Sequence, residues 1–151
     1  MKNQTKKISA IIPSAWVGAR MSSVKAKQYL KIDNLSILEK TVSHFVEADI
    51  FEKIIIPVAK GDKDIKLMNF YNYKNIYIVE GGKTRSHSVL NSLGETEPDS
   101  LVMVHDAVRP FITKKEILEL CDRFSENSSD ILIYGIPVYE SLKMIDKQSL
   151  K

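Results

Sequence analysis

Basic side chains occur in four separate segments of this sequence, and their chemistry suits a bound polyphosphate. The cations are Arg20, Lys27, Arg85, Arg109 and Lys143, and the carboxylates near them are Asp106 and Glu140. Arginine presents a planar fork of donors and lysine a movable point charge, so both neutralise phosphate oxygens. A lone carboxylate beside such cations can hold a divalent ion that bridges the same phosphates. The residue types therefore indicate a site for a polyphosphate with a metal ion.

Each of these groups follows a segment that we expect to be a β-strand. The expected strands are Ile8–Pro13, Lys53–Val58, Ile76–Val79, Leu101–Val104 and Ile131–Val138. Strands rich in Ile and Val and separated by helices predict a parallel sheet that is covered on both faces. The carboxyl ends of parallel strands share one edge, where open α/β proteins bind their ligands. We therefore expect the polar segments to meet in one crevice.

Helical patterns fill the intervals between these strands. Ser36–Glu39 and Thr113–Glu116 have the pattern of capping boxes that start a helix. The expected apolar faces are Leu38, Val42, Phe45 and Val46 in the first helix, Val89, Leu90 and Leu93 in a helix over Ser86–Leu93, and Ile117, Cys121 and Phe124 in the last. A short helix is expected around Ile65–Phe70. The pattern predicts an α/β fold, a three-layer, mostly parallel Rossmann-like sheet with helices on both faces, in a single domain over residues 1–151.

Composition excludes several classes of protein. The chain has 151 residues, 44% hydrophobic and 27% charged, which is typical of one soluble globular domain. A net charge of +3 gives no concentrated basic face, so we expect no nucleic-acid partner. Cys121 is the only cysteine, which favours a reducing, cytoplasmic setting. The first apolar run stops at Pro13, too short for a signal peptide, and no segment is long enough to span a membrane.

Several of these residues also have a purely structural interpretation. Asp106 directly follows an expected strand, where a helix N-cap is as reasonable as a metal ligand. The pair Gly81-Gly82 is consistent with an ordinary turn, and Ser88 with a residue that helps a helix to start. His105 is expected to pack or to form a hydrogen bond rather than to act in catalysis.

Four motifs taken together are more specific than any one of them. They are Pro13-Ser-Ala-x-x-Gly18-x-Arg20-Met21, Lys27-Gln-Tyr-Leu30, Gly81-Gly-x-x-Arg-x-x-Ser88-Val and Val104-His-Asp-Ala-x-Arg-Pro110. In this order and spacing they resemble the 2-C-methyl-D-erythritol 4-phosphate cytidylyltransferases, enzymes of isoprenoid precursor synthesis in the non-mevalonate pathway. The ribitol-5-phosphate cytidylyltransferases look similar over the same motifs, so ribitol phosphate stays open as the acceptor.

The resemblance implies transfer of a cytidylyl group from CTP to a sugar-alcohol phosphate, with release of pyrophosphate and with Mg²⁺ as cofactor. Carried over by motif, Arg20 and Lys27 would be the catalytic residues and Asp106 the metal ligand. The nucleotide-binding residues would be Ser14, Ala15, Gly18, Gly82, Ser88 and Ala107. Arg109, Ser141 and Lys143 would lie on the side of the acceptor substrate. The family also implies a homodimer.

Three departures from the family pattern favour an alternative. Trp16 stands where the family has a glycine that approaches the triphosphate, and Ala26 stands where it has a proline. Family members are longer, so we expect the C-terminal part of the family domain, with the arm that forms the dimer, to be absent from this chain. The alternative is a catalytically impaired remnant that keeps only the fold or weak nucleotide binding.

Overall fold

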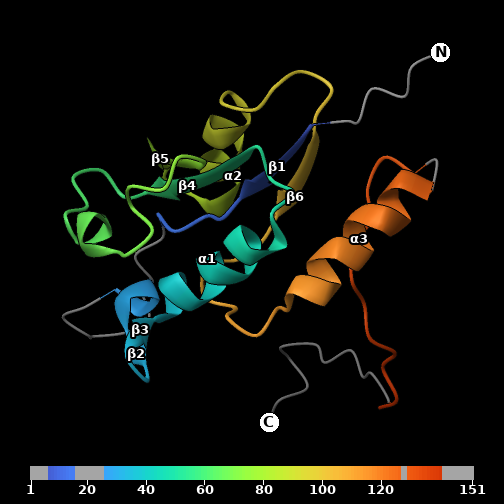
Figure 1. Ribbon diagram of the computed structural model, residues 1–151, viewed down its shortest axis with the longest axis horizontal. Coiled ribbons are helices and arrows are strands. Elements are labelled where there is room, and N and C mark those ends of the chain that lie inside the picture. The colour runs from blue at the N-terminus through green and yellow to red at the C-terminus, as the bar shows by residue number, and fades with distance from the viewer. Residues whose placement is uncertain (1–6, 16–25, 127–128, 141–151) are drawn as a thin grey trace, which may run out of the picture. The chain divides into compact units, whose positions relative to one another are not determined.

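The computed structural model describes residues 7–15, 26–126 and 129–140. Its elements are β1 (Ile8–Ile11), the 3₁₀ helix η1 (Lys27–Tyr29), β2 (Lys31–Ile32), β3 (Leu35–Ser36), α1 (Ile37–Ala48), β4 (Lys53–Val58), the 3₁₀ helix η2 (Asp64–Leu67), β5 (Ile76–Glu80), α2 (Arg85–Leu93), β6 (Leu101–Val104) and α3 (Lys114–Glu126) (Figure 1). Contacts divide the chain into two units, Met1–Glu119 and Leu120–Lys151, so the single domain remains a prediction.

A four-stranded parallel sheet in the order β5-β4-β1-β6 forms the centre of the first unit. β1 pairs with β4 through Ala10 opposite Ile54, and with β6 through Ala10 opposite Met103. β1 and β4 are almost wholly buried, because both of their faces are covered. The four strands predicted up to residue 104 are confirmed, two of them with the same bounds.

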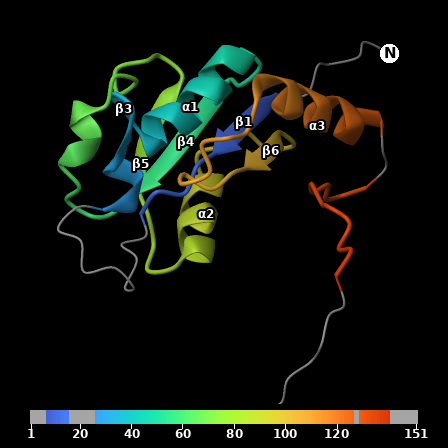
Figure 2. The same ribbon diagram turned by 90° about the horizontal axis from the view of Figure 1, so that it is seen from below.

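Helices α1 and α2 lie on opposite sides of this sheet, as Figure 2 shows. α1 buries Leu38, Val42 and Phe45 completely, which confirms the predicted apolar face at these positions. Phe45 packs on Phe51 with ring centroids 5.4 Å apart. With α1 on one face of the sheet and α2 on the other, the fold has the predicted three layers (Figure 2).

The predicted apolar face of α2 is wrong. Leu90 and Leu93 are exposed, whereas the buried residues of the helix are Ser88 and Ser92. Both serine hydroxyls donate to the carbonyl one turn earlier, at Thr84 and Ser88. A serine that satisfies its own hydroxyl in this way is small enough for close packing, so hydrophobic periodicity did not reveal the buried face.

The predicted fifth strand over Ile131–Val138 is also wrong. Within the second unit, residues 129–140 are irregular, and Ile131, Ile133 and Ile136 are exposed. A strand exists only where neighbouring backbone groups complete its hydrogen bonds, and the pairings among the described residues include none for this segment. Pro137 also lacks a backbone donor. The Ile and Val residues of this segment have a high propensity for β-strands, but propensity alone does not supply the partner strand that a sheet requires.

The capping box that starts α1 also holds a distant loop. Glu39 Oε2 accepts from the backbone N–H of Ser36 at 2.7 Å, and the Ser36 hydroxyl accepts from Glu39 N–H at 3.1 Å. The other carboxylate oxygen, Oε1, accepts from the N–H of Asn69 at 3.1 Å, just after η2. One buried carboxylate therefore joins the helix start to the segment after β4.

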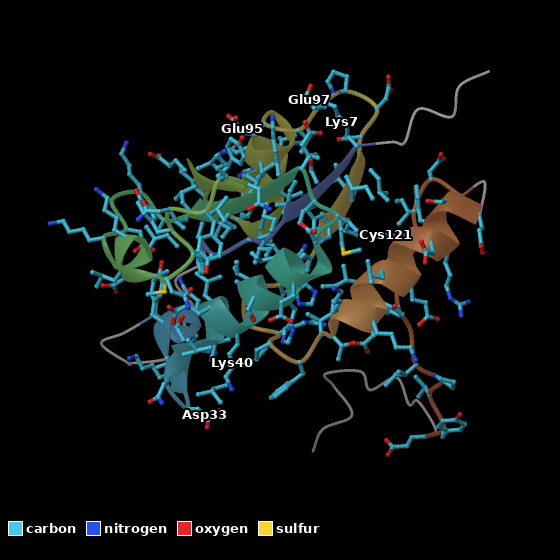
Figure 3. The ribbon with its side chains drawn as sticks, viewed as in Figure 1. Lys7, Asp33, Lys40, Glu95, Glu97 and Cys121 are labelled. Carbon is cyan, nitrogen blue, oxygen red and sulfur yellow. The ribbon has the colours of Figure 1, made fainter. Side chains whose placement is uncertain are left out.

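A short hairpin precedes α1 and is fixed to it by an ion pair. β2 and β3 are antiparallel, and the turn between them contains Asp33 with φ of 58°. Lys40 of α1 donates to Asp33 Oδ2 at 2.8 Å (Figure 3). The hairpin leads the chain from η1 into the capping box of α1.

We predict that Glu39→Gln destabilises the protein at neutral pH. Burial opposes ionisation of Glu39, but the backbone hydrogen bonds from Ser36 and Asn69 outweigh it and lower its pKa. Gln offers a single acceptor oxygen, so one buried N–H loses its partner, which costs about 1–2 kcal/mol. Because the pKa is lower in the folded state, this stability is present above the unfolded pKa and is lost as pH falls through the folded value.

Urea unfolding at pH 7 and at pH 3.5 measures this effect. The difference between the unaltered chain and Glu39→Gln should be largest at pH 7 and shrink at pH 3.5. Glu47→Gln, on the exposed side of α1, is the matched control. A difference that does not change with pH would contradict the assigned role of the carboxylate.

Candidate functional site

The loops after β1, β4, β5 and β6 meet at the carboxyl edge of the sheet. Backbone hydrogen bonds continue past the strand ends: Ser14 N–H donates to Pro57 O at 2.9 Å, and Gly81 N–H to Val58 O at 2.8 Å. On the other side, His105 N–H donates to Ile11 O at 3.0 Å. The edge is therefore held by the same ladder that forms the sheet.

A cavity of about 240 Å³ opens at this edge. Its lining residues are Pro13, Ser14, Ala15, Lys27, Gln28, Arg85, Ser88, Asp106, Ala107 and Val108. They come from the loops after β1 and β6, from η1 and from the start of α2. The convergence predicted from the sequence is confirmed for these segments.

The glycine pair after β5 is required by close packing. A Cβ at Gly81 would clash with the Cβ of Ala15 and lie 2.9 Å from the Ser88 hydroxyl. A Cβ at Gly82 would clash with the side chain of His87. An ordinary turn would not require glycine at both positions for lack of space, so the simpler interpretation of Gly81-Gly82 is incomplete.

Ser88 holds the glycine loop in place. Its hydroxyl accepts from the N–H of Gly82 at 3.0 Å and donates to the carbonyl of Thr84 at 3.0 Å. Thr84 in turn caps α2 by accepting from His87 N–H at 3.1 Å. Ser88 is only 2% exposed, so it shapes the wall of the cavity through the backbone of Gly82.

Asp106 lies between two arginines. Arg85 Nε donates to Asp106 Oδ1 at 2.8 Å, and Arg109 Nε lies 3.0 Å from Oδ2 in a second ion pair. The Asp106 side chain is 29% exposed, whereas those of Arg85 and Arg109 are 57% and 73% exposed. Charge pairs that exposed are worth about 0–1 kcal/mol each, so they exchange easily with other partners. The cluster has a net positive charge.

Two uncharged side chains, Thr41 and His105, form hydrogen bonds that hold the loop carrying Asp106. Thr41 of α1 donates its hydroxyl to Ala107 O at 2.9 Å. His105 Nε2 lies 3.0 Å from Arg109 O, and its ring packs on Phe45. Burial lowers the pKa of His105, although the hydrogen bond to Arg109 opposes this shift, so a neutral ring that donates to the carbonyl is favoured. His105 therefore has the packing role expected from the sequence.

The structure brings most of the predicted site residues together. Ser14, Ala15, Lys27, Ser88, Asp106 and Ala107 line the cavity. Gly82 is bound to Ser88, and Arg109 to Asp106. The remaining predicted positions, Gly18, Arg20, Ser141 and Lys143, lie outside the described residues, as does Trp16. The roles assigned to all of these residues stay predictions.

Sequence reasoning gave no role to three residues that shape the site. Arg85 pairs with Asp106 and lines the cavity, Gln28 also lines it, and Thr41 donates a hydrogen bond to the loop of Asp106. Gln28 lies between Lys27 and Tyr29 in one of the motifs, which was its only signal. Thr41 has no local signal, because its partner Ala107 is far away in the sequence.

Comparison with known proteins identifies relatives over nearly the whole chain. Residues 8–150 match the family model described as 2-C-methyl-D-erythritol 4-phosphate cytidylyltransferase. A curated protein of that name from Actinobacillus pleuropneumoniae serotype 7 (strain AP76) is 38% identical over 142 residues, which is 94% of this chain and 62% of the relative. This chain thus spans about three fifths of that relative's length.

Solved structures share the fold. The Francisella tularensis 2-C-methyl-D-erythritol 4-phosphate cytidylyltransferase superposes with a TM-score of 0.76 at 30% identity, covering 95% of this chain and 63% of that one. Rv0371c from Mycobacterium tuberculosis H37Rv, solved in complex with manganese, has a TM-score of 0.63 at 14% identity, covering 80% and 61% of the two chains, which shows a common fold alone. Among the residues that the structure describes, none of the helices has the length and apolar character to cross a bilayer.

We predict that Gly81→Ala destabilises the protein by about 1–3 kcal/mol, the usual cost of overpacking a filled site. The added methyl group would clash with the Cβ of Ala15 and press on the hydroxyl of Ser88, which is buried. Urea unfolding measures the loss. Gly94→Ala is the matched control, since its nearest neighbour would be 3.4 Å away. Equal stability of the two variants would contradict the proposed packing.

Proposed function

The chain belongs to the 2-C-methyl-D-erythritol 4-phosphate cytidylyltransferase family, and we propose that it serves the reaction of that family. The reaction transfers a cytidylyl group from CTP to 2-C-methyl-D-erythritol 4-phosphate. An oxygen of the acceptor phosphate attacks the α-phosphorus of CTP, and the bond to the β-phosphate breaks, so that pyrophosphate leaves. Because the chain spans about three fifths of the relative's length, the proposal concerns the protein as a whole.

The convergence of opposite charges in one cavity supports the proposal best. Lys27 reaches the cavity from η1 and Arg85 from the start of α2, and Asp106 lies between Arg85 and Arg109. A triphosphate carries several negative charges, which a cluster with excess positive charge attracts. The apolar wall from Pro13, Ala15 and Val108 suits the flat face of a base.

The described residues would act by binding and orienting the phosphates. Lys27 would donate to phosphate oxygens and stabilise the negative charge that increases on them during transfer. Arg85 would turn from Asp106 toward the phosphates, which its exposed position allows. Ser88 and Gly82 would hold the wall against which the nucleotide rests. No covalent intermediate is needed, because positioning and charge account for the rate.

The donor set fits a divalent cation only in part. Asp106 is the only carboxylate among the described lining residues, and those described residues include no group of three or more potential ligands. Magnesium commonly takes one or two carboxylates and completes its shell with phosphate oxygens and water. Asp106 would therefore hold Mg²⁺ together with the phosphates of CTP. The ion, when bound, would supply positive charge to the phosphate oxygens.

Other parts of the assignment belong to the same proposal. The base would contact Ser14, Ala15 and Ala107, and the acceptor would lie toward Arg109. A homodimer and a cytoplasmic setting remain expectations from the family and from the single Cys121. Ribitol phosphate as acceptor and an impaired remnant are the alternatives that binding and turnover measurements separate.

We predict that this chain binds CTP, and that Mg²⁺ strengthens the binding through Asp106. In Asp106→Asn the gain from Mg²⁺ should disappear. Binding without metal should be unchanged or tighter, because a negative charge near the phosphates has been removed. Calorimetric titration of CTP, with Mg²⁺ and with a chelator, measures both effects.

Asp33→Asn is the matched control, since this carboxylate is exposed and pairs with Lys40 outside the cavity. It should leave the gain from Mg²⁺ intact. Equal gain in Asp106→Asn would remove Asp106 from the metal site, and no CTP binding to the well-folded chain would favour the remnant.

A further inference from the structure

The three residues of η1 direct their side chains to three different places. A 3₁₀ helix has about three residues per turn, so successive side chains diverge by about 120°. Lys27 and Gln28 both line the cavity, but Lys27 is exposed, whereas Gln28 and Tyr29 are 4% and 3% exposed. Lys27 therefore brings a positive charge to the cavity, and the two buried neutral residues are its anchors.

The first anchor is Gln28. Its Nε2 donates to the carbonyl of Ser14 at 2.9 Å in a buried hydrogen bond. Ser14 belongs to the loop that follows β1, and it is itself bonded to Pro57 of β4. Gln28 thus fixes η1 to the loop that follows β1.

The second anchor is Tyr29. Its hydroxyl donates to Asp62 Oδ2 at 2.8 Å, and the other oxygen of Asp62 accepts from the N–H groups of Asp64 and Ile65 at 3.0 and 3.4 Å. Burial is the larger cause and this hydrogen bond the smaller cause of a raised pKa for Tyr29, so the phenol keeps its proton and remains a donor at physiological pH. Asp62 does not line the cavity. Tyr29 thus fixes η1 to the loop after β4.

We propose that Gln28, Tyr29 and Asp62 are positioning residues that hold the ammonium of Lys27 toward a phosphate group in the cavity. The inference rests on the proposed function in taking the ligand to be a polyphosphate. It goes beyond that function by giving a role to Asp62, which lies outside the cavity. The two hydrogen bonds fix a helix of one turn, which backbone hydrogen bonds alone hold weakly.

Asp62 gives the sharpest test, because charge and position predict opposite results. Removing a negative charge near an anion site strengthens anion binding if charge alone matters. If Asp62 positions Lys27, Asp62→Ala instead weakens CTP binding. Asp62→Asn restores most of the affinity, because its amide still pairs with the Tyr29 hydroxyl and its oxygen with the backbone.

A double-mutant cycle tests whether the effect passes through Lys27. Titrations of the full chain with CTP, inorganic pyrophosphate and cytidine would compare Tyr29→Phe, Lys27→Met and the double variant. We expect Lys27→Met to weaken CTP and pyrophosphate binding about tenfold or more, the size of one charge-assisted hydrogen bond. Tyr29→Phe should weaken both about fivefold and leave cytidine unchanged, and it should add nothing in the Lys27→Met background.

Tyr73→Phe, at an exposed tyrosine, is the matched control and should have no effect on any of the three ligands. Additive losses in the cycle, equal loss of cytidine binding, or tighter CTP binding by Asp62→Ala would each overturn the inference. The proposed function fails separately, when the unaltered chain binds pyrophosphate but shows no preference for CTP. Absence of pyrophosphate binding overturns both.

Discussion

Pairing of β1 with a parallel strand on each side is the constraint on which the site depends. β4 and β6 both hydrogen-bond to β1, and the bonding continues beyond the strand end through Ser14 and His105. Because all three strands point the same way, their loops leave the sheet at one edge. Segments that are far apart in the sequence therefore meet at this edge, and no additional contact is needed to bring them together. The charged residues contribute little to this geometry, since the backbone ladder has already set it.

The groups that hold the loops differ in kind from the groups that face the cavity. The loops are held by neutral or buried hydrogen bonds: Thr41 to Ala107, Ser88 to Gly82, and Gln28 to Ser14. Such bonds are shielded from water, and breaking one leaves a buried group unsatisfied at a cost of about 1–3 kcal/mol. They therefore hold the walls of the cavity without help from the charged side chains.

The parts of the fold that were predictable from the sequence are those encoded locally. The run Lys53–Val58 is apolar from Ile54 onward and predicts β4 with its observed bounds, and Ser36 with Glu39 predicts the start of α1. Contacts between distant residues have no such signal. Nothing near Thr41 indicates Ala107, and Ser92 looks like a surface residue although it is buried. Residues 131–138 show the opposite case: their local pattern predicts a strand, but the structure has none there, because strand propensity does not specify a partner strand. The motifs predict the candidate site and contain two of its supports, Gln28 and Ser88, but nothing in the sequence predicts the support from Thr41.

Charge in the cavity is arranged so that a ligand can rearrange it without disturbing the fold. Arg85 and Arg109 are more than half exposed, so water screens their pairs with Asp106 and each pair contributes little to stability. In the proposed function a bound phosphate would offer Arg85 an equivalent partner, and Asp106 would then have an oxygen free for a cation. Because the loop of Asp106 is held by Thr41 and His105, this exchange would need only side chains to move. The bonds that hold the loops are thus separate from the charged groups proposed to bind the ligand, which allows a site rich in like charges to exist at the edge of a well-packed sheet.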